Sequence, residues 1–183
     1  MPTREEYDAV VYDLDGTLVR LRVDWDAVAA DLRNMLVDAG HDAEGDAWDC
    51  LAAAESVGLY DAAHERIAAH EHEGARDSVR LAVADELPTL NTAVGVCSLN
   101  AERAVRAALD RHDLTQYVDS VVARGTIPER KPRPEPLLRA VRELGAVPSN
   151  ALFVGDSASD EETARRAGTD FAYVGDGPTD VGR

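Results

Sequence analysis

The sequence predicts an α/β fold in which helices cover both faces of a parallel sheet. Short apolar runs alternate with helix-like segments along the second half of the chain, and these runs are continuous rather than mixed with polar residues. Such runs are typical of parallel strands that are buried on both faces. Helical segments between roughly residues 20 and 74 interrupt the alternation, so we expect an insertion after the first strand. The 183 residues suit one core with a modest insertion.

The elements can be placed along the chain by their apolar spacing and by their end signals. The first strand is expected at residues 8–12 and ends in the loop Asp13-Leu14-Asp15-Gly16-Thr17. A helix is expected at 23–39, with Asp24 as its N-cap and Gly40 at its end. Weaker helical patterns follow at 44–56 and 59–72, and a further helix at 77–87 before Pro88. Strands are then expected at 94–98, 118–123, 151–154 and 171–174, separated by helices at 101–111, 135–144 and 160–167.

The composition limits the class of partner. The formal net charge is -16, with 35 acidic residues against 19 basic ones. This surface repels nucleic acid and anionic membranes, whereas a small phosphorylated metabolite needs only one positive pocket and a metal ion. An acid excess with almost no lysine also resembles halophilic proteins, because high salt screens the self-repulsion.

No apolar run is long enough to span a membrane, and no stretch near the start resembles a signal peptide, so we expect a cytoplasmic protein. The two cysteines, Cys50 and Cys97, fit no zinc spacing and are expected to be buried thiols.

Polar residues follow several of the predicted strands where those strands end. In open parallel sheets, ligands lie beyond the carboxyl ends of the strands, so these residues should meet at one edge. A carboxylate in the first loop, Asp13, can attack phosphorus beside a hard cation such as Mg²⁺. A second carboxyl two residues on, Asp15, is placed to protonate the leaving oxygen and later to take a proton from water. Gly16 allows a sharp turn there, and Thr17 can bond within the loop.

The other strand ends add an alcohol, an amine and two more acids. Ser98 precedes a helix, where its hydroxyl and the nearby N–H groups suit phosphate oxygens, although an N-cap serine looks the same. Lys131 is the single lysine among the 19 basic residues, and it lies in a proline-rich loop. A lysine held there can bridge the phosphate and the attacking carboxylate. Asp156 is placed as a metal ligand, and Asp160 as a second ligand, an outer acid or a helix cap.

Four segments together resemble the ordered motifs of the haloacid dehalogenase-like superfamily: Asp13-Leu14-Asp15-Gly16-Thr17, Ser98, Lys131-Pro132 and Gly155-Asp156-Ser157-x-x-Asp160. The segments around Lys131 and from Asp156 to Gly168 look most like its phosphoglycolate phosphatase-like branch. The resemblance implies a Rossmann-like core at 1–19 and 75–183, with a small helical cap at 20–74. It also implies that Asp13 is the nucleophile and Asp15 the acid and base. Mg²⁺ would be bound by Asp13, the main-chain carbonyl of Asp15 and Asp156, with Asp160 in support, while Ser98 and Lys131 hold the phosphoryl group.

The chain departs from the family pattern at two places. Many relatives have Asn directly after the serine of the second motif, but here Leu99 precedes Asn100. Many phosphatases of the family carry Asp-Ser shortly after the first motif, where this chain has Arg20-Leu21. Gly16, Thr17 and Asn100 are candidates for substrate contact, although the shift by one residue affects the expected role of Asn100 and not that of Ser98. In the cap, Arg22, His64, Arg66 and His70 are candidates, with exposed helical residues as the favoured alternative. His70 and His72 are two residues apart and do not share a helix face, which excludes a metal site between them.

The sequence leaves three functions open: hydrolysis of a phosphomonoester, a sugar phosphomutase and a catalytically idle binding protein. Hydrolysis of a phosphomonoester fits the intact pair of aspartates, because the resemblance implies that dehalogenases lack the second one. Phosphonate cleavage in the family uses a cap lysine, and sugar phosphomutases carry a comparable one, whereas this cap has none. A catalytically idle binding protein is the alternative from another class.

Overall fold

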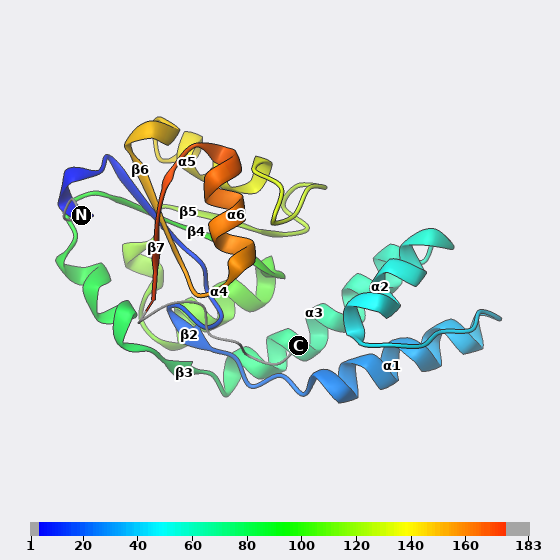
Figure 1. The fold of residues 1–183 in the computed structure, drawn as a ribbon. Helices are drawn as coiled ribbons and strands as arrows, with labels where there is room; N and C mark the ends of the chain where they lie inside the picture. Colours follow the sequence, from blue (N-terminus) through cyan, green and yellow to red (C-terminus); the bar gives the residue numbers. More distant parts are fainter. Residues whose placement is uncertain (1–3, 175–183) are drawn as a thin grey trace.

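A computed structural model, which describes residues 4–174, confirms the predicted α/β class (Figure 1). At its centre lies a five-stranded sheet in the order β5-β4-β1-β6-β7, with every neighbouring pair parallel. These strands are β1 (Ala9–Tyr12), β4 (Ala93–Ala101), β5 (Ser120–Arg124), β6 (Ala151–Gly155) and β7 (Asp170–Tyr173). The middle strand, β1, is the one that leads into the first acidic loop, so this loop starts at the centre of the sheet.

Helices cover both faces of the sheet, as the continuous apolar strands require. Successive side chains of a strand point to opposite faces, so β1 contributes to two separate cores. Val10 and Tyr12 pack in one core with α4 (Glu102–Arg111). Ala9 and Val11 pack in the other with α5 (Glu135–Glu143) and α6 (Ala158–Ala167).

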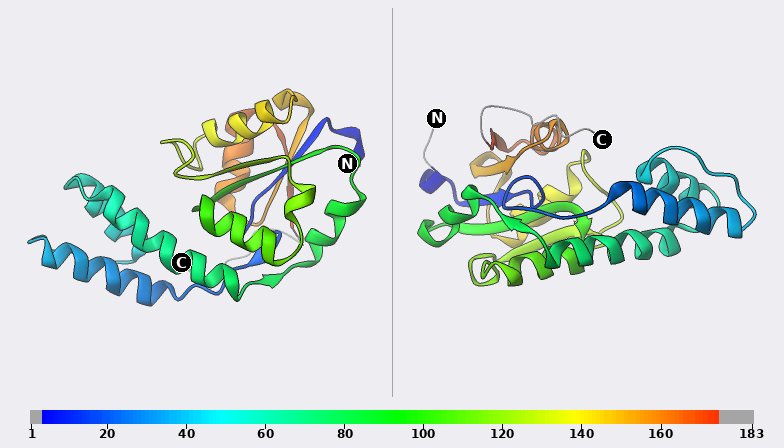
Figure 2. Two further views of the ribbon diagram at one scale, coloured as in Figure 1. Left: turned by 180° about the vertical axis from the view of Figure 1, so that it is seen from behind. Right: turned by 90° about the horizontal axis from the view of Figure 1, so that it is seen from below.

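Three helices form a separate group at one end of the sheet. They are α1 (Trp25–Asp38), α2 (Ala47–Ser56) and α3 (Tyr60–Arg76), and they surround their own apolar cluster, which includes Leu32 and Leu51. The predicted N-cap is confirmed, because the Asp24 side chain accepts a hydrogen bond from the Ala27 N–H at 3.0 Å. Figure 2 shows this group reaching away from the sheet as an arm. The helix α3 runs back to the sheet and packs along α4.

The predicted helix at 77–87 is wrong. Val79–Arg80 is a short strand, β3, which pairs antiparallel with β2 (Val19–Arg20), and Ala82–Thr89 is a 3-10 helix, η2. The pairing of β3 with β2 depends on the tertiary structure. The spacing of apolar residues along the sequence therefore cannot reveal it. The two strands lie at the points where the chain leaves the first loop and returns to the sheet, so they join the ends of the inserted segment.

The remaining elements differ from the predictions mainly at their ends. β4 extends to Ala101, and its pairing with β5 shifts register between Cys97 and Ala101. Short 3-10 helices, η1, η3 and η4, lie at Arg4–Glu6, Thr115–Tyr117 and Pro148–Asn150. Both cysteines are buried free thiols. Among the described residues, no helix has the length and apolar character needed to cross a membrane.

The division into a core at 1–19 and 75–183 and a cap at 20–74 stays a prediction. Its second boundary falls inside α3, whose last turn already packs in the core through Ala75. Residues 1–3 and 175–183 of the predicted core lie outside the described part of the chain.

Candidate active site

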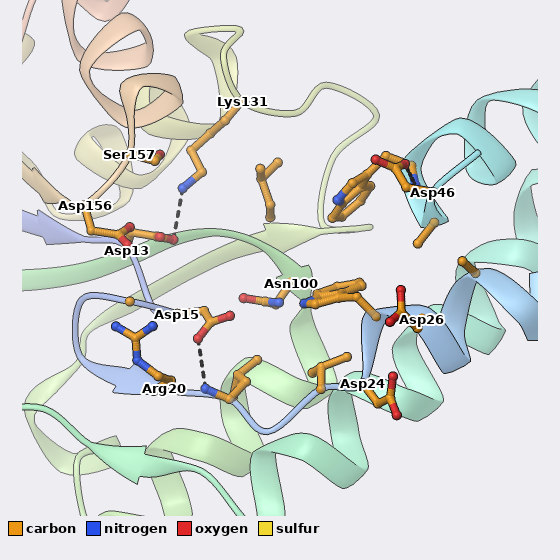
Figure 3. A pocket seen from close by; sticks show the side chains of 18 of the residues that line it. Asp13, Asp15, Arg20, Asp24, Asp26, Asp46, Asn100, Lys131, Asp156 and Ser157 are labelled. Atoms are coloured by element: carbon orange, nitrogen blue, oxygen red, sulfur yellow. Dashed lines mark hydrogen bonds and ion pairs between the residues drawn. The ribbon is translucent and has the colours of Figure 1, made fainter. Parts of the chain in front are cut away.

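Three of the predicted site residues meet at the carboxyl edge of the sheet. Asp13 follows β1, Asp156 follows its neighbour β6, and Lys131 comes from the loop after β5. The Lys131 ammonium donates to Asp13 Oδ1 at 2.9 Å (Figure 3). It also donates to Asp160 Oδ1 at 2.5 Å. All four side chains are buried, with Lys131 only 6% exposed. The end of β1 and the loop after β5 therefore bring the single lysine of the chain against the first carboxylate.

Burial and the neighbouring charges together determine which of these side chains are ionised. Burial raises the pKa of Asp13 above its usual range, and the Lys131 ammonium opposes that rise. Burial alone would lower the pKa of Lys131, but the carboxylates of Asp13 and Asp160 outweigh it and raise that pKa. Lys131 therefore stays charged and favours the ionised form of Asp13 that a nucleophile requires.

The acids fit a hard cation. Asp13, Asp156 and Asp160 each offer a carboxylate oxygen, and these oxygens lie within 4.8 Å of one another. Oxygen ligands at such spacing suit Mg²⁺. The oxygens of Asp160 already bind other groups, since Oδ1 accepts from Lys131 and Oδ2 accepts from the Ser157 hydroxyl at 2.6 Å. Asp160 thereby holds Lys131 and the start of α6 in place.

Gly16 is required by the shape of the acidic loop. Its φ is +87°, a left-handed conformation, and a Cβ there would lie 2.1 Å from Asp156 Oδ2. Only glycine avoids both the strain and the clash. Gly16 therefore lets the loop after β1 approach the Asp156 carboxylate closely.

Asp15 lies on the other side of the same loop. Its Oδ1 accepts a hydrogen bond from the Leu21 N–H at 2.8 Å (Figure 3). Burial, only partly offset by this hydrogen bond and by Arg20, raises the pKa of Asp15 from 3.8 to about 6. A carboxyl with this pKa can both give and take a proton near neutral pH.

Ser98 and Asn100 lie together where β4 shifts register. The Ser98 hydroxyl donates to Asn100 Oδ1 at 3.0 Å, and the Asn100 N–H donates to Ser98 Oγ at 3.2 Å. Bulges of this kind often re-aim side chains beside active sites. Asn100 lines the pocket, and Ser98 is buried beside Asn100 without being one of the lining residues. Thr17 is buried with a hydroxyl oxygen that has no partner among the described residues.

A pocket of about 840 Å³ connects the acidic loop to the helical arm. It is lined on the sheet side by Asp13, Asp15, Gly16, Asn100, Lys131, Asp156 and Ser157. From the arm come Trp25 and Trp48, which are the two tryptophans of the chain and whose ring centroids are 5.5 Å apart. Arg20 and Arg33 also line it. Its size is that of a pocket for a small organic ligand.

The cap residues chosen from the sequence do not line this pocket. Arg66 and His70 both pair with Asp31, and His64 stacks on Tyr60. Arg22 is exposed outside it.

Sequence reasoning therefore missed the cap residues that do face the pocket, Trp25, Trp48, Arg20 and Arg33. The pair Trp25 and Trp48 was a usable signal, because large aromatic side chains at the starts of two helices are candidates for a pocket wall. At Arg20 the sequence alone shows only a departure from the family pattern.

Several known proteins are similar in sequence to this chain. A phosphoglycolate phosphatase of Aquifex aeolicus is 39% identical over 81 residues, 44% of this chain and 38% of that protein. The pyrophosphatase PpaX of Bacillus cereus (strain AH820) is 37% identical over 89 residues, 49% of this chain and 41% of that protein. A phosphoglycolate phosphatase of Chromobacterium violaceum is 29% identical over 202 residues, covering 94% of this chain and 87% of that protein. The chain thus spans about two fifths of the length of the first relatives it matches.

The fold is shared with solved structures. The crystal structure of a hydrolase of this superfamily, subfamily IA, from Geobacter sulfurreducens has a TM-score of 0.62 at 24% identity, covering 91% of this chain and 86% of that chain. The family described as haloacid dehalogenase-like hydrolase matches residues 55–180 of the 183. With the sheet order, the acidic loop and this match in agreement, the chain belongs to the haloacid dehalogenase-like hydrolases.

Proposed function

We propose that this chain is a magnesium-dependent phosphatase that hydrolyses a small phosphomonoester through an aspartyl-phosphate on Asp13. The observation that supports this most directly is the buried contact of Lys131 with Asp13, 2.9 Å long, beside the carboxylates of Asp156 and Asp160. A lysine and an acid cluster at the end of a pocket provide a nucleophile, a phosphate-binding cation and oxygen ligands for a metal. We propose that the activity is phosphoglycolate phosphatase-like, in line with the relatives named above.

The chemistry follows from the positions of the side chains. The Asp13 carboxylate attacks phosphorus, so an O–P bond forms and the bond to the leaving oxygen breaks. Asp15 gives its proton to that oxygen and then takes one from the water that hydrolyses the acyl-phosphate. Lys131 and Ser98 stabilise the phosphoryl oxygens in both steps. Magnesium, held by Asp13, Asp156 and the Asp15 carbonyl, would neutralise the phosphate charge that otherwise repels these acids.

Two alternatives are less well supported. A sugar phosphomutase of this superfamily would need a cap lysine by family resemblance, and the only lysine of this chain is Lys131. A catalytically idle binding protein would not need a lysine placed against the first aspartate.

The pyrophosphatase among the relatives keeps pyrophosphate open as a substrate. We propose a small phosphorylated metabolite as partner and a cytoplasmic location.

Phosphate release from an aryl phosphate tests the proposal. The wild-type chain is expected to release phosphate with Mg²⁺, and to lose this activity in EDTA and recover it when Mg²⁺ is restored. Asp13→Asn is expected to abolish turnover while its circular dichroism spectrum is unchanged. Well-folded protein without turnover at low or high salt would favour the idle alternative, and substantial turnover by Asp13→Asn would contradict the nucleophile.

The substrate can be sought by binding to the inactive variant. Both tryptophans lie in the pocket wall, so the intrinsic fluorescence of Asp13→Asn reports on ligands that enter it. Phosphoglycolate, pyrophosphate, sugar phosphates and nucleotides form the panel. The physiological class should quench or shift this emission at the lowest concentration and should also show the highest kcat/KM with the wild type.

A further inference from the structure

A buried ion pair joins α3 of the helical arm to the edge of the sheet. Glu71 of α3 is 0% exposed and Arg124 at the end of β5 is 3% exposed. The two side chains form a bidentate pair, with Arg124 Nη2 2.7 Å from Glu71 Oε2 and Nη1 3.1 Å from Oε1. The other described ion pairs between the arm and the sheet unit, Arg103–Glu65 and Arg130–Glu55, are exposed. The Glu71 pair therefore differs from them in its burial.

The same carboxylate also binds the segment that follows Ser98. Glu71 Oε1 accepts from the Asn100 side-chain amide at 3.1 Å, and Oε2 accepts from the Ala101 N–H at 2.9 Å. Four donors thus surround one carboxylate, two from Arg124 and two from the bulged part of β4. This explains how a charged side chain can be fully buried, because each oxygen has partners.

This arrangement decides which way the Asn100 amide points. A carboxylate only accepts hydrogen bonds, so Asn100 must turn its NH₂ group towards Glu71 and its Oδ1 the other way. Oδ1 then accepts the proton of the Ser98 hydroxyl, while the Asn100 N–H holds the Ser98 oxygen. The orientation of a phosphate-binding serine is thereby tied to a glutamate on the arm.

A role in stability alone does not account well for such a pair. Moving two charges out of water is costly, and apolar residues of similar volume often replace a buried pair without loss of stability. The pair does, however, specify one arrangement of polar atoms at the pocket, where small displacements reduce rates strongly.

We infer that Glu71 and Arg124 are positioning residues, which fix the Asn100 amide and through it the Ser98 hydroxyl for the phosphoryl group. This inference rests on the proposed phosphatase function. Glu71 and Arg124 do not line the pocket, so their effect passes through residues that do. These are Asn100, which Glu71 binds, and Trp48, whose ring centroid lies 5.8 Å from the Arg124 guanidinium carbon. The arm thus contributes to the phosphate site itself as well as to the wall of the pocket.

The test compares two double variants that break one ion pair each. Glu71→Leu/Arg124→Leu removes the buried pair and keeps apolar packing. Glu65→Gln/Arg103→Gln removes the exposed pair that joins the same helix, α3, to α4. Melting temperature, kcat, KM and the affinity for inorganic phosphate with Mg²⁺ are measured, with assays well below each melting temperature.

We expect the buried-pair variant to lose about tenfold or more in kcat and in phosphate affinity. It should also melt below the wild-type temperature, because the Asn100 amide and the Ala101 N–H lose their acceptor. The exposed-pair variant should match the wild type in both kcat and phosphate affinity. Folded Glu71→Leu/Arg124→Leu protein with wild-type kcat and phosphate affinity would overturn the inference.

Two further outcomes need separate interpretation: a buried-pair variant that does not fold, and a wild-type chain without activity. If the buried-pair variant does not fold, Glu71→Gln decides, because its amide brings an N–H donor to a place where all neighbours donate. The same losses in folded Glu71→Gln support the inference, and unchanged kcat and phosphate affinity overturn it. A wild-type chain that turns over no phosphate ester would instead defeat the proposed function, whereas an active wild type with unaffected variants defeats this inference alone.

Discussion

At the scale of single residues, Lys131 carries the largest share of the proposed chemistry. Its ammonium is buried, lies 5.5 Å from the centroid of the Phe153 ring and contacts two carboxylates. An arginine carries the same charge, but its flat guanidinium needs more room and a different donor geometry.

Lys131→Arg is therefore expected to lower kcat/KM by about a hundredfold or more, because the guanidinium cannot keep both contacts and displaces Asp13. Steady-state kinetics with an aryl phosphate measure the loss. Arg130→Lys, at the exposed neighbouring position, serves as the matched control and should keep wild-type kinetics. Near-normal turnover of Lys131→Arg would show that the site does not need an ammonium.

The buried carboxyl of Asp15 makes stability depend on pH. Its pKa is raised from 3.8 in the free side chain to about 6 in the fold, so the native state binds more protons between these values. The free energy of unfolding therefore falls as the pH rises from 3.8 to about 6, and it does not recover at higher pH. Asp15→Asn keeps an oxygen for the Leu21 N–H but has no charge to bury.

With a chelator present to remove metal ions, Asp15→Asn should raise the free energy of unfolding by about 1–3 kcal/mol at about pH 8. At about pH 4 the increase should be much smaller. Urea unfolding at the two pH values measures this difference. An equal effect at both would mean that the carboxyl titrates normally.

Much of the residue-level geometry could be read from the sequence, since the ends of parallel strands share one edge. The contact of Asp13 with Lys131 follows from that rule. The Glu71–Arg124 pair was missed, because the run His70-Glu71-His72-Glu73 looks like an exposed charged face. A usable signal existed nonetheless. Ile67, Glu71 and Ala75 are four residues apart on one helix face, and its apolar members are buried.

At the scale of elements, the helices with clear caps and apolar faces were predicted to within a few residues. The failure at 77–87 has a physical cause, since Val79–Arg80 is held by pairing with β2 rather than by local spacing. The register shift in β4 was not visible either, because a bulge depends on the partner strand.

The start of α6 links helix capping to the active site. Ser157 is the N-cap, and its hydroxyl also donates to Asp160, which holds Lys131. Ser157→Ala should cost about 1 kcal/mol of stability, whereas Ser157→Gly should cost only a few tenths, since glycine is a tolerated N-cap. Both remove the donor to Asp160, so both should reduce kcat alike. Thermal melts and kinetics of the two variants separate the roles, and loss of activity in the alanine variant alone would contradict this assignment.

At the scale of the whole molecule, the charge of -16 is the dominant feature. The negative charges repel one another across the surface. As the salt concentration rises, the distance over which this repulsion acts becomes shorter. The melting temperature is therefore expected to rise between about 0.1 M and 1 M KCl, since the Debye length falls from about 10 Å to 3 Å. An isosmolar sucrose series is the control for effects other than screening. A flat or falling melting temperature in KCl would contradict the proposed adaptation to high salt.

The presence of one lysine has a practical consequence for studying the molecule. An acylating reagent that is selective for lysine side chains has a single target, and that target lies 3% exposed between two carboxylates. The rate at which this one amine is modified thus measures how often the inner site becomes accessible, without any label or mutation. A bound phosphate ester that blocks the entrance should slow the modification. Mass spectrometry of the peptide that contains Lys131 would register it separately from acylation of the α-amino group.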